Sequence, residues 1–264
     1  MKPATPVPIH AVAGRNSEKR EDLVAVEEPM EIRVGEHSIA VTMRTPGNDF
    51  ELAAGFLFTE GVVTRPEELK SIRHCAGSNF NVVRVELNAA GRFDPARLSR
   101  HVFTSSSCGM CGKKTLEQVR AVMPGPVRRS SPPSSETLYL LPQRLREGQN
   151  FFATTGGMHA AALFDRRGEP LLVREDVGRH NATDKLVGAL LLKGGLPAQD
   201  TLILVSGRAS FELVQKAAMA GIPTLAAVGA PSSLAIELAR ECGMTLIGFL
   251  RDGRYNIYTG EGGI

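Results

Sequence analysis

Apolar strands alternate with helical segments along the last third of the sequence, and this alternation constrains the fold more than any other feature. The runs at 201–206, 224–228 and 245–250 are short and almost wholly apolar, as expected for strands buried on both faces. A helical pattern at 181–192 precedes them, and helical patterns at 211–220 and 233–242 separate them. We therefore predict an α/β sheet with parallel neighbours and helices on both faces. Ligands of such sheets bind at the carboxyl ends of the strands.

The rest of the chain divides by composition. Its first residues mix Pro, Gly, Asn, Ser and charges without periodicity, which predicts a disordered tail. Alternating runs around Gly35 then predict a β-hairpin, followed by a helix and a further strand. A segment rich in Ser, Gly, Pro, Lys and Arg comes next. We predict a tail at 1–21, a smaller N-terminal α+β part at 22–104, a flexible loop segment at 105–139 and an α/β cofactor-binding domain at 140–264.

Composition limits the class of protein. The net charge is only +3 and the basic residues are spread out with few aromatics between them, so no nucleic-acid footprint is evident. No apolar stretch reaches the roughly 18 residues of a membrane helix, and the N-terminus lacks the order of a signal peptide. Four cysteines in a chain of this length do not indicate a disulfide-rich secreted fold. We expect a cytoplasmic protein that binds a small anionic ligand and no membrane.

Cys108 and Cys111 form a Cys-x-x-Cys motif just before a predicted helix at 113–122. The positive end of that helix and two adjacent lysines favour the thiolate of Cys108, which predicts a nucleophile that Cys111 can assist or resolve. Half of a zinc site, a thioredoxin-like redox pair and incidental thiols are the alternatives. Zinc would need a second pair, but Cys75 and Cys242 are isolated. The thioredoxin pattern would place the motif after a strand, whereas a Ser-rich loop precedes it here.

Polar clusters follow or precede several predicted strands and are the candidates for anion binding. Paired glycines before a strand, and a Gly-Arg turn after one, allow close backbone approach to a phosphate. A tight turn or a solvated helix start is the alternative for each. The sequence contains neither a Walker loop nor a Rossmann fingerprint. The candidate residues are Gly156, Gly157, His159, Arg179, His180, Ser206, Gly207 and Arg208.

The last apolar strand runs into a stretch with two arginines around a glycine turn. Such a pair could hold a pyrophosphate or the edge of a guanine, although an exposed hairpin tip with solvated charges is the alternative. The residues are Phe249, Leu250, Arg251, Asp252, Gly253 and Arg254.

Together these motifs resemble the formate dehydrogenase accessory sulfurtransferase (FdhD) family. The resemblance lies in PGNDFELAAGF at 46–56, SSCGMCG at 106–112, TGGMHAA at 155–161, REDVGRHN at 174–181, DK at 184–185, SGR at 206–208, IP at 222–223 and FLR at 249–251. It implies a homodimer with a cytidine-deaminase-like α/β fold. It also implies that sulfur from a cysteine desulfurase passes to the molybdenum or tungsten bis-pterin guanine dinucleotide cofactor for formate dehydrogenase. Cys108 would carry the persulfide, Cys111 would be a second thiol, and residues 249–254 would contact the cofactor.

The resemblance further implies that a guanine nucleotide can mimic the cofactor and that no zinc is expected. The zinc-deaminase pattern is absent, because His159 is followed by two alanines where that pattern has a glutamate. Two other functions remain open from the residues. One is a chaperone that binds and delivers the molybdenum cofactor without transferring sulfur, and the other is a zinc- or thiol-dependent hydrolase.

Overall fold

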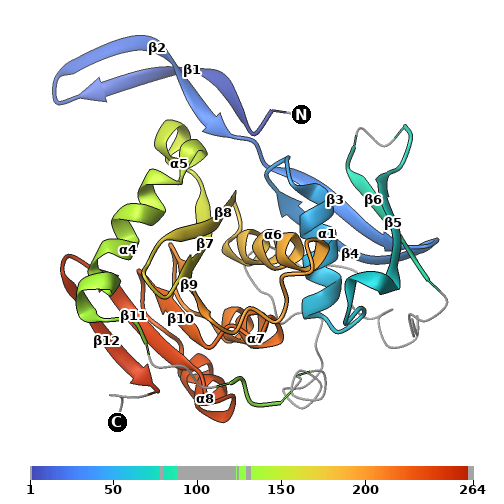
Figure 1. Ribbon diagram of the computed structural model, residues 1–264. Helices are drawn as coiled ribbons and strands as arrows, with labels where there is room; N and C mark the ends of the chain where they lie inside the picture. The colour runs from blue at the N-terminus through green and yellow to red at the C-terminus, as the bar shows by residue number, and fades with distance from the viewer. Residues whose placement is uncertain (1, 78–79, 89–122, 124, 129–131, 261–264) are drawn as a thin grey trace.

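The computed structural model describes residues 2–77, 80–88, 123, 125–128 and 132–260. Within them two sheets and a helical layer stack on one another, and a two-stranded arm projects from one side (Figure 1). The elements are β1 (Ala4–Ala13), β2 (Asn16–Ala25), β3 (Glu28–Val34), β4 (His37–Arg44), α1 (Asp49–Thr59), η1 (Pro66–Glu68), β5 (Leu69–His74), β6 (Val82–Leu87), α4 (Ser135–Glu147), α5 (Asn150–Thr155), β7 (His159–Asp165), β8 (Pro170–Asp176), α6 (Arg179–Leu192), β9 (Thr201–Val205), α7 (Phe211–Met219), β10 (Thr224–Ala227), α8 (Ser233–Glu241), β11 (Thr245–Arg251) and β12 (Arg254–Thr259).

The C-terminal half forms the predicted α/β sheet. Its six strands lie in the order β12-β11-β10-β9-β7-β8. Strands β9, β10 and β11 run parallel, while the hairpins β7–β8 and β11–β12 add antiparallel edges. Helix α4 covers one face, where Leu138 and Leu141 meet alternate residues of the strands. Helices α6, α7 and α8 cover the other. The prediction of helices on both faces is therefore confirmed, and the cytidine-deaminase-like detail stays a prediction.

The N-terminal half forms a four-stranded sheet in the order β4-β3-β6-β5, with α1 against it. The predicted hairpin around Gly35 is present as β3 and β4, and β6 matches the predicted strand. Strand β5 was not predicted, because its pattern LKSIRH exposes several of its residues and lacks a continuous apolar run. This half is α+β, as predicted.

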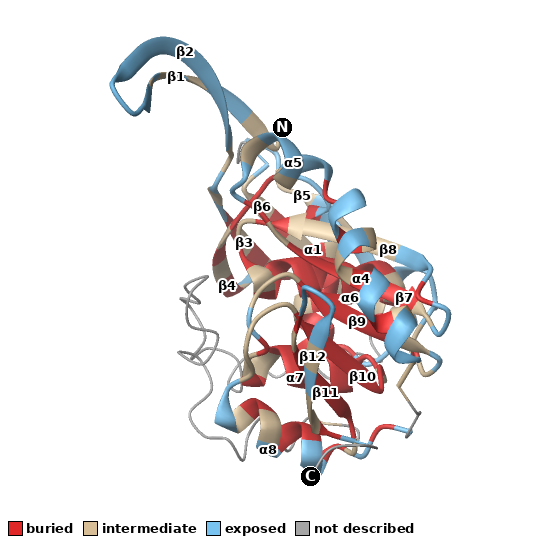
Figure 2. Cartoon of the chain, turned by 90° about the vertical axis from the view of Figure 1, so that its left-hand side faces the viewer, coloured by how far each residue is buried: buried red, intermediate tan, exposed pale blue. Residues whose placement is uncertain are grey.

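One hydrophobic core joins the two halves. Buried residues of β3, β6 and α1 belong to the same cluster as those of α6, α7 and β9, and the buried region in Figure 2 runs through both. Helices α1 and α6 approach each other through Gly55 and Gly188. A Cβ on Gly188 would lie 1.8 Å from the carbonyl oxygen of Glu51, so the contact admits no side chain. The N-terminal part and the C-terminal sheet therefore pack as one unit.

The predicted disordered tail at 1–21 is wrong. Residues 4–25 form an antiparallel hairpin, β1 and β2, paired residue by residue over its whole length. This arm is mostly exposed and projects from the body in Figures 1 and 2. Prolines 6 and 8 suggested disorder, yet an edge strand accepts prolines whose missing N–H would face solvent. Propensity alone therefore misjudged the segment.

Two other boundaries differ from the prediction. Helix α4 begins at Ser135, where the Ser134 hydroxyl accepts a hydrogen bond from the Thr137 N–H, so the predicted loop segment at 105–139 extends too far. Strand β12 was not predicted either, since only its tip was read as a possible hairpin. Most of the predicted flexible loop lies outside the described residues.

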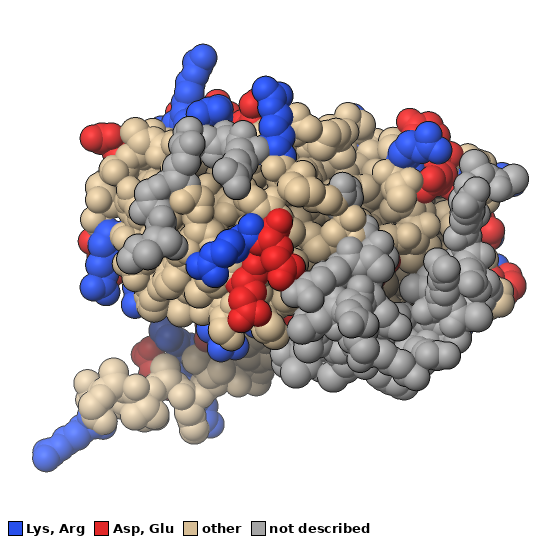
Figure 3. All heavy atoms as spheres, turned by 90° about the horizontal axis from the view of Figure 1, so that it is seen from below, with Lys and Arg blue, Asp and Glu red and all other residues tan. Residues whose placement is uncertain are grey.

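The surface carries charges of both signs. On the face seen in Figure 3, Lys and Arg side chains are interspersed with Asp and Glu side chains. Among the helices of the described ranges, none is long and apolar enough to cross a membrane.

Candidate functional site

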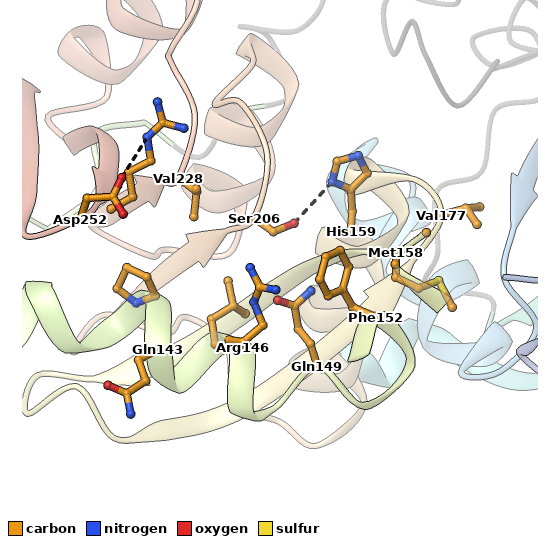
Figure 4. A pocket seen from close by; sticks show the side chains of 15 residues that line it. Gln143, Arg146, Gln149, Phe152, Met158, His159, Val177, Ser206, Val228 and Asp252 are labelled. Atoms are coloured by element: carbon orange, nitrogen blue, oxygen red, sulfur yellow. Dashed lines mark hydrogen bonds and ion pairs between the residues drawn. The ribbon is translucent and has the colours of Figure 1, made fainter. Parts of the chain in front are cut away.

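A pocket of about 840 Å³ opens at the edge of the six-stranded sheet where β8, β9, β10 and β11 all end. Strand β7 runs the other way, so its first residue, His159, lies at this same edge. The topology thus gathers residues that are far apart in sequence, as predicted for the carboxyl ends of parallel strands. Figure 4 shows the pocket as elongated, with Asp252 toward one end and Met158 and Val177 toward the other.

The strand-end wall contains four of the predicted residues: Gly156, Gly157, His159 and Ser206. Gly156 ends α5 with a φ of 63°, a left-handed conformation that suits glycine. The Ser206 hydroxyl accepts a hydrogen bond from the Ala160 N–H at 2.9 Å and lies 3.4 Å from the His159 Nδ1 (Figure 4). This wall therefore combines exposed backbone with a fixed hydroxyl and an imidazole.

Burial lowers the pKa of His159, and the nearby positive charge of Arg179 lowers it further. The charge of His180 also lowers the pKa of His159, while the negative charge of Asp176 raises it. At neutral pH the imidazole is therefore neutral, and it can accept or donate a hydrogen bond without adding a charge.

The opposite wall comes from α4 and α5 and was missed by the sequence reading. It presents Gln143, Arg146, Gln149 and Phe152. The Arg146 guanidinium lies over the Phe152 ring, 4.7 Å from its centroid, which is a cation–π contact. The buried leucines of α4 predicted which face of the helix meets the sheet, but the sequence held no signal that its last turn borders the strand ends.

The β11–β12 turn contributes only part of the predicted stretch. Arg251 and Asp252 line the pocket, and their side chains approach to 4.0 Å. Leu250 is fully buried in the hydrophobic core with α4, so its side chain does not line the pocket. Both arginines of the stretch are exposed on the β11–β12 hairpin. The pocket lining does not include Phe249, Gly253 and Arg254.

Arg179 and Gly207 border the pocket without lining it. A Cβ placed on Gly207 would lie 3.4 Å from both the Arg179 side chain and the His159 ring, so these three residues are packed together. Arg208 points to solvent next to this group. The Gly207 carbonyl accepts a hydrogen bond from the Gly229 N–H, which ties the β9 and β10 ends together.

His180 faces away from the pocket, toward the start of α7. Its Nε2 lies 3.1 Å from the Ser210 hydroxyl and 3.7 Å from a carboxylate oxygen of Glu212. The neighbouring His180 imidazole lowers the pKa of Glu212 to about 2. His180 therefore anchors the two helix starts to each other, and its predicted ligand contact is not found in the described pocket.

Much of the polar cluster at 174–185 lies in the seam between the two halves, which we define as the contacts of α1 and the β4–α1 loop with α6 and α7. Lys185, almost fully buried, pairs with Asp176 at 2.7 Å and donates to the Thr45 and Glu175 carbonyls. Asp184 is bound at both oxygens by Lys216, at 2.7 and 2.8 Å. These charges satisfy one another and leave nothing for a ligand.

Cys108 and Cys111 lie outside the described residues. Of the other cysteines, Cys242 is buried, and burial raises the pKa of its thiol to about 11, which makes it unreactive at neutral pH. Cys75 is partly buried. Across the described ranges, no three His, Cys, Asp or Glu side chains gather in a group that could hold a metal.

Comparison with known proteins places these features in a family. The family model described as FdhD/NarQ matches residues 25–264, which begins where the arm ends. Two proteins named sulfur carrier protein FdhD are similar over most of their length. The one from Mycolicibacterium paratuberculosis is 52% identical, covering 95% of this chain and 94% of its own. The one from Streptomyces avermitilis is 53% identical, covering 92% and 89%.

A solved structure has the same fold. It is a crystal structure from Desulfotalea psychrophila whose description assigns it provisionally to formate dehydrogenase accessory proteins. It matches with a TM-score of 0.80 at 24% identity and covers all of both chains.

Proposed function

This chain belongs to the FdhD/NarQ family, and from that membership we propose that it is a sulfur carrier that serves formate dehydrogenase. In this proposal it accepts sulfur from a cysteine desulfurase as a persulfide on Cys108. It then transfers the sulfur to a molybdenum or tungsten bis-pterin guanine dinucleotide, which it binds as a substrate. The observation that carries the second part is the strand-end pocket, where sequence-distant motif residues meet.

The pocket has features that suit an anionic dinucleotide. Arg146 and Arg251 supply positive charge, and the Gly156–Gly157 turn offers backbone without side chains in the way. The neutral imidazole of His159 and the Ser206 hydroxyl add hydrogen-bonding groups. Phe152 supplies an aromatic surface for a ring. The elongated outline in Figure 4 fits a ligand that carries a ring at one end and phosphates beyond it.

The sulfur steps balance with two thiols. The Cys108 thiolate attacks the outer sulfur of the donor persulfide, which forms the Cys108 persulfide and releases the donor thiolate. The Cys111 thiolate then attacks the inner sulfur, so that a Cys108–Cys111 disulfide forms and the outer sulfur leaves as hydrosulfide. The metal of the substrate would exchange an oxo ligand for this sulfur, and with one proton taken up the oxo oxygen would leave as water. A cellular dithiol reduces the disulfide before the next cycle.

The proposal includes the partners expected from the family: a cysteine desulfurase, formate dehydrogenase and a second copy of this chain in a homodimer. It also places the protein in the cytoplasm, where the cofactor is inserted. A guanine nucleotide such as GDP is the simplest mimic of half of the substrate.

The experiment is sulfur loading. Purified protein is incubated with a cysteine desulfurase and cysteine, and intact and peptide mass spectrometry record whether one sulfur atom is added. We expect a reducible gain on the peptide that contains Cys108, lost in Cys108→Ala. Cys242→Ala is the matched control and should load like the wild type, because that thiol is buried and protonated.

Absence of sulfur on Cys108 in a protein that still binds GDP would contradict the carrier role. It would support the alternative in which the protein binds and delivers the cofactor as a chaperone.

A further inference from the structure

Gln149 is an almost fully buried polar residue whose side-chain amide faces the pocket. It lies between α4 and α5 and is 4% exposed. Its backbone is fixed at both ends, because its N–H donates to the Arg146 carbonyl and its own carbonyl accepts from the Ala153 N–H. The side-chain amide lines the pocket, yet it makes no hydrogen bond with any residue of the described ranges. In Figure 4 it points from the helical wall toward Ser206.

A second glutamine on the same wall behaves differently. Gln143 also lines the pocket, but its side chain is exposed and donates to the Glu147 carboxylate at 2.9 Å. Water can satisfy Gln143 at little cost. The Gln149 amide is open only toward the pocket, so a ligand that fills the pocket displaces the water there and must complete the hydrogen bonds of the amide.

The surroundings of Gln149 define the chemistry of that ligand. Phe152 lies beside it, and the Arg146 guanidinium covers one face of its ring, 4.7 Å from the centroid, which holds the ring in place. A primary amide presents one donor and one acceptor side by side. Together they suit a flat heterocycle whose edge carries adjacent N–H and C=O groups, since an amide binds such an edge through two hydrogen bonds.

We propose that Gln149 binds the cyclic amide edge of a 2-amino-4-oxopyrimidine ring, the unit that guanine and pterins share. This rests on the proposed function, because the dinucleotide substrate carries that ring in both its guanine and its pterin parts. Gln149 is thus a specificity residue for the ring, while Arg251, at the β11 end of the pocket lining, serves the phosphates.

Calorimetric titration tests the proposal with three probes: GDP, 6-hydroxymethylpterin and inorganic pyrophosphate. Gln149→Ala should weaken binding of GDP, of the pterin, or of both by about tenfold or more, because the ring loses its hydrogen bonds. Pyrophosphate, which has no ring, should bind the variant within about twofold of wild type. Asn88→Ala, which removes an exposed amide outside the pocket lining, is the matched control and should change none of the affinities by more than about twofold. Circular dichroism confirms that the variants fold.

The outcomes separate this proposal from the proposed function. A loss confined to GDP identifies guanine as the bound ring, and a loss confined to the pterin identifies the pterin. If wild type binds both rings and Gln149→Ala binds both equally well, the role of Gln149 is overturned and the sulfur-carrier function stands. If wild type binds neither ring, the substrate pocket of the proposed function fails, and the role of Gln149 fails with it.

Discussion

The seam between the two halves and the strand-end pocket both contain polar side chains, but only in the seam are those side chains fully paired with one another. In the seam, Lys185 makes one ion pair and two hydrogen bonds to carbonyls, so its charge is fully matched. In the pocket, Gln149 makes no side-chain hydrogen bond to a described residue, and Arg251 is exposed. Polar side chains that are paired with one another therefore stabilise the fold in the seam. Those of the pocket remain available to bind a ligand.

The two regions also use glycine differently, and this gives the largest expected effect. A Cβ on Gly188 would overlap the backbone of α1, whereas a Cβ on Gly207 would make only ordinary contacts. Gly188→Ala should therefore lose at least about 4 kcal/mol of unfolding free energy or fail to fold. Gly207→Ala, the matched control, should fold normally. Urea unfolding measures both, and a stable Gly188→Ala protein would contradict the packing described for the seam.

The next effect is the loss of a buried charge. Lys185→Met leaves the carboxylate of Asp176 without its cation, although the Thr45 and Gly178 N–H groups still donate to it. The free energy of unfolding should fall by about 3 kcal/mol. Arg251→Met removes an exposed cation from the pocket and should change it by less than about 0.5 kcal/mol. Urea unfolding measures both variants. Equal losses of unfolding free energy would contradict the view that charges are paired in the seam and free in the pocket.

For ligand affinity, in contrast to stability, the substitution in the pocket should have the clear effect. Arg251→Met should weaken GDP binding roughly tenfold, because a charge-assisted hydrogen bond to phosphate is lost. Arg254→Met is the matched control on the same hairpin and should leave the affinity unchanged, since Arg254 is not part of the pocket lining. Fluorescence or calorimetric titration measures both. Unaltered binding by Arg251→Met would exclude this arginine from the site.

The smallest expected effect is a change in the pKa of the His159 imidazole. Arg179 is one of the causes that lower the pKa of His159, after burial. Arg179→Met keeps the length of the side chain and removes its charge, so the pKa of His159 should rise toward its ordinary value. It should stay below that value, because the ring remains buried. An NMR titration of the His159 ring measures the change, and a further fall in the pKa would contradict the assignment.

The sequence predicted the strand ends as the site because apolar runs with polar endings define them locally. It could not separate Arg179 from Lys185, since nothing in the local pattern shows that Lys185 is buried against Asp176 and donates to the Thr45 carbonyl, 140 residues away. Gln149 and Phe152 were missed for a related reason: only the tertiary fold brings the end of α4 to the sheet edge. The arm was misjudged because strand pairing overrode its composition.

Hydrogen–deuterium exchange with and without saturating GDP tests most directly whether the pocket, and not the seam, is the ligand site. We predict slower exchange at residues 149–159, where Gln149, the Gly156–Gly157 turn and His159 meet the ligand, and at 206–208. Peptides of α1 and of α6 from residue 182 onward should exchange at the same rate in both states. Slowed exchange confined to those helices, with 149–159 unchanged, would contradict the assignment of the site.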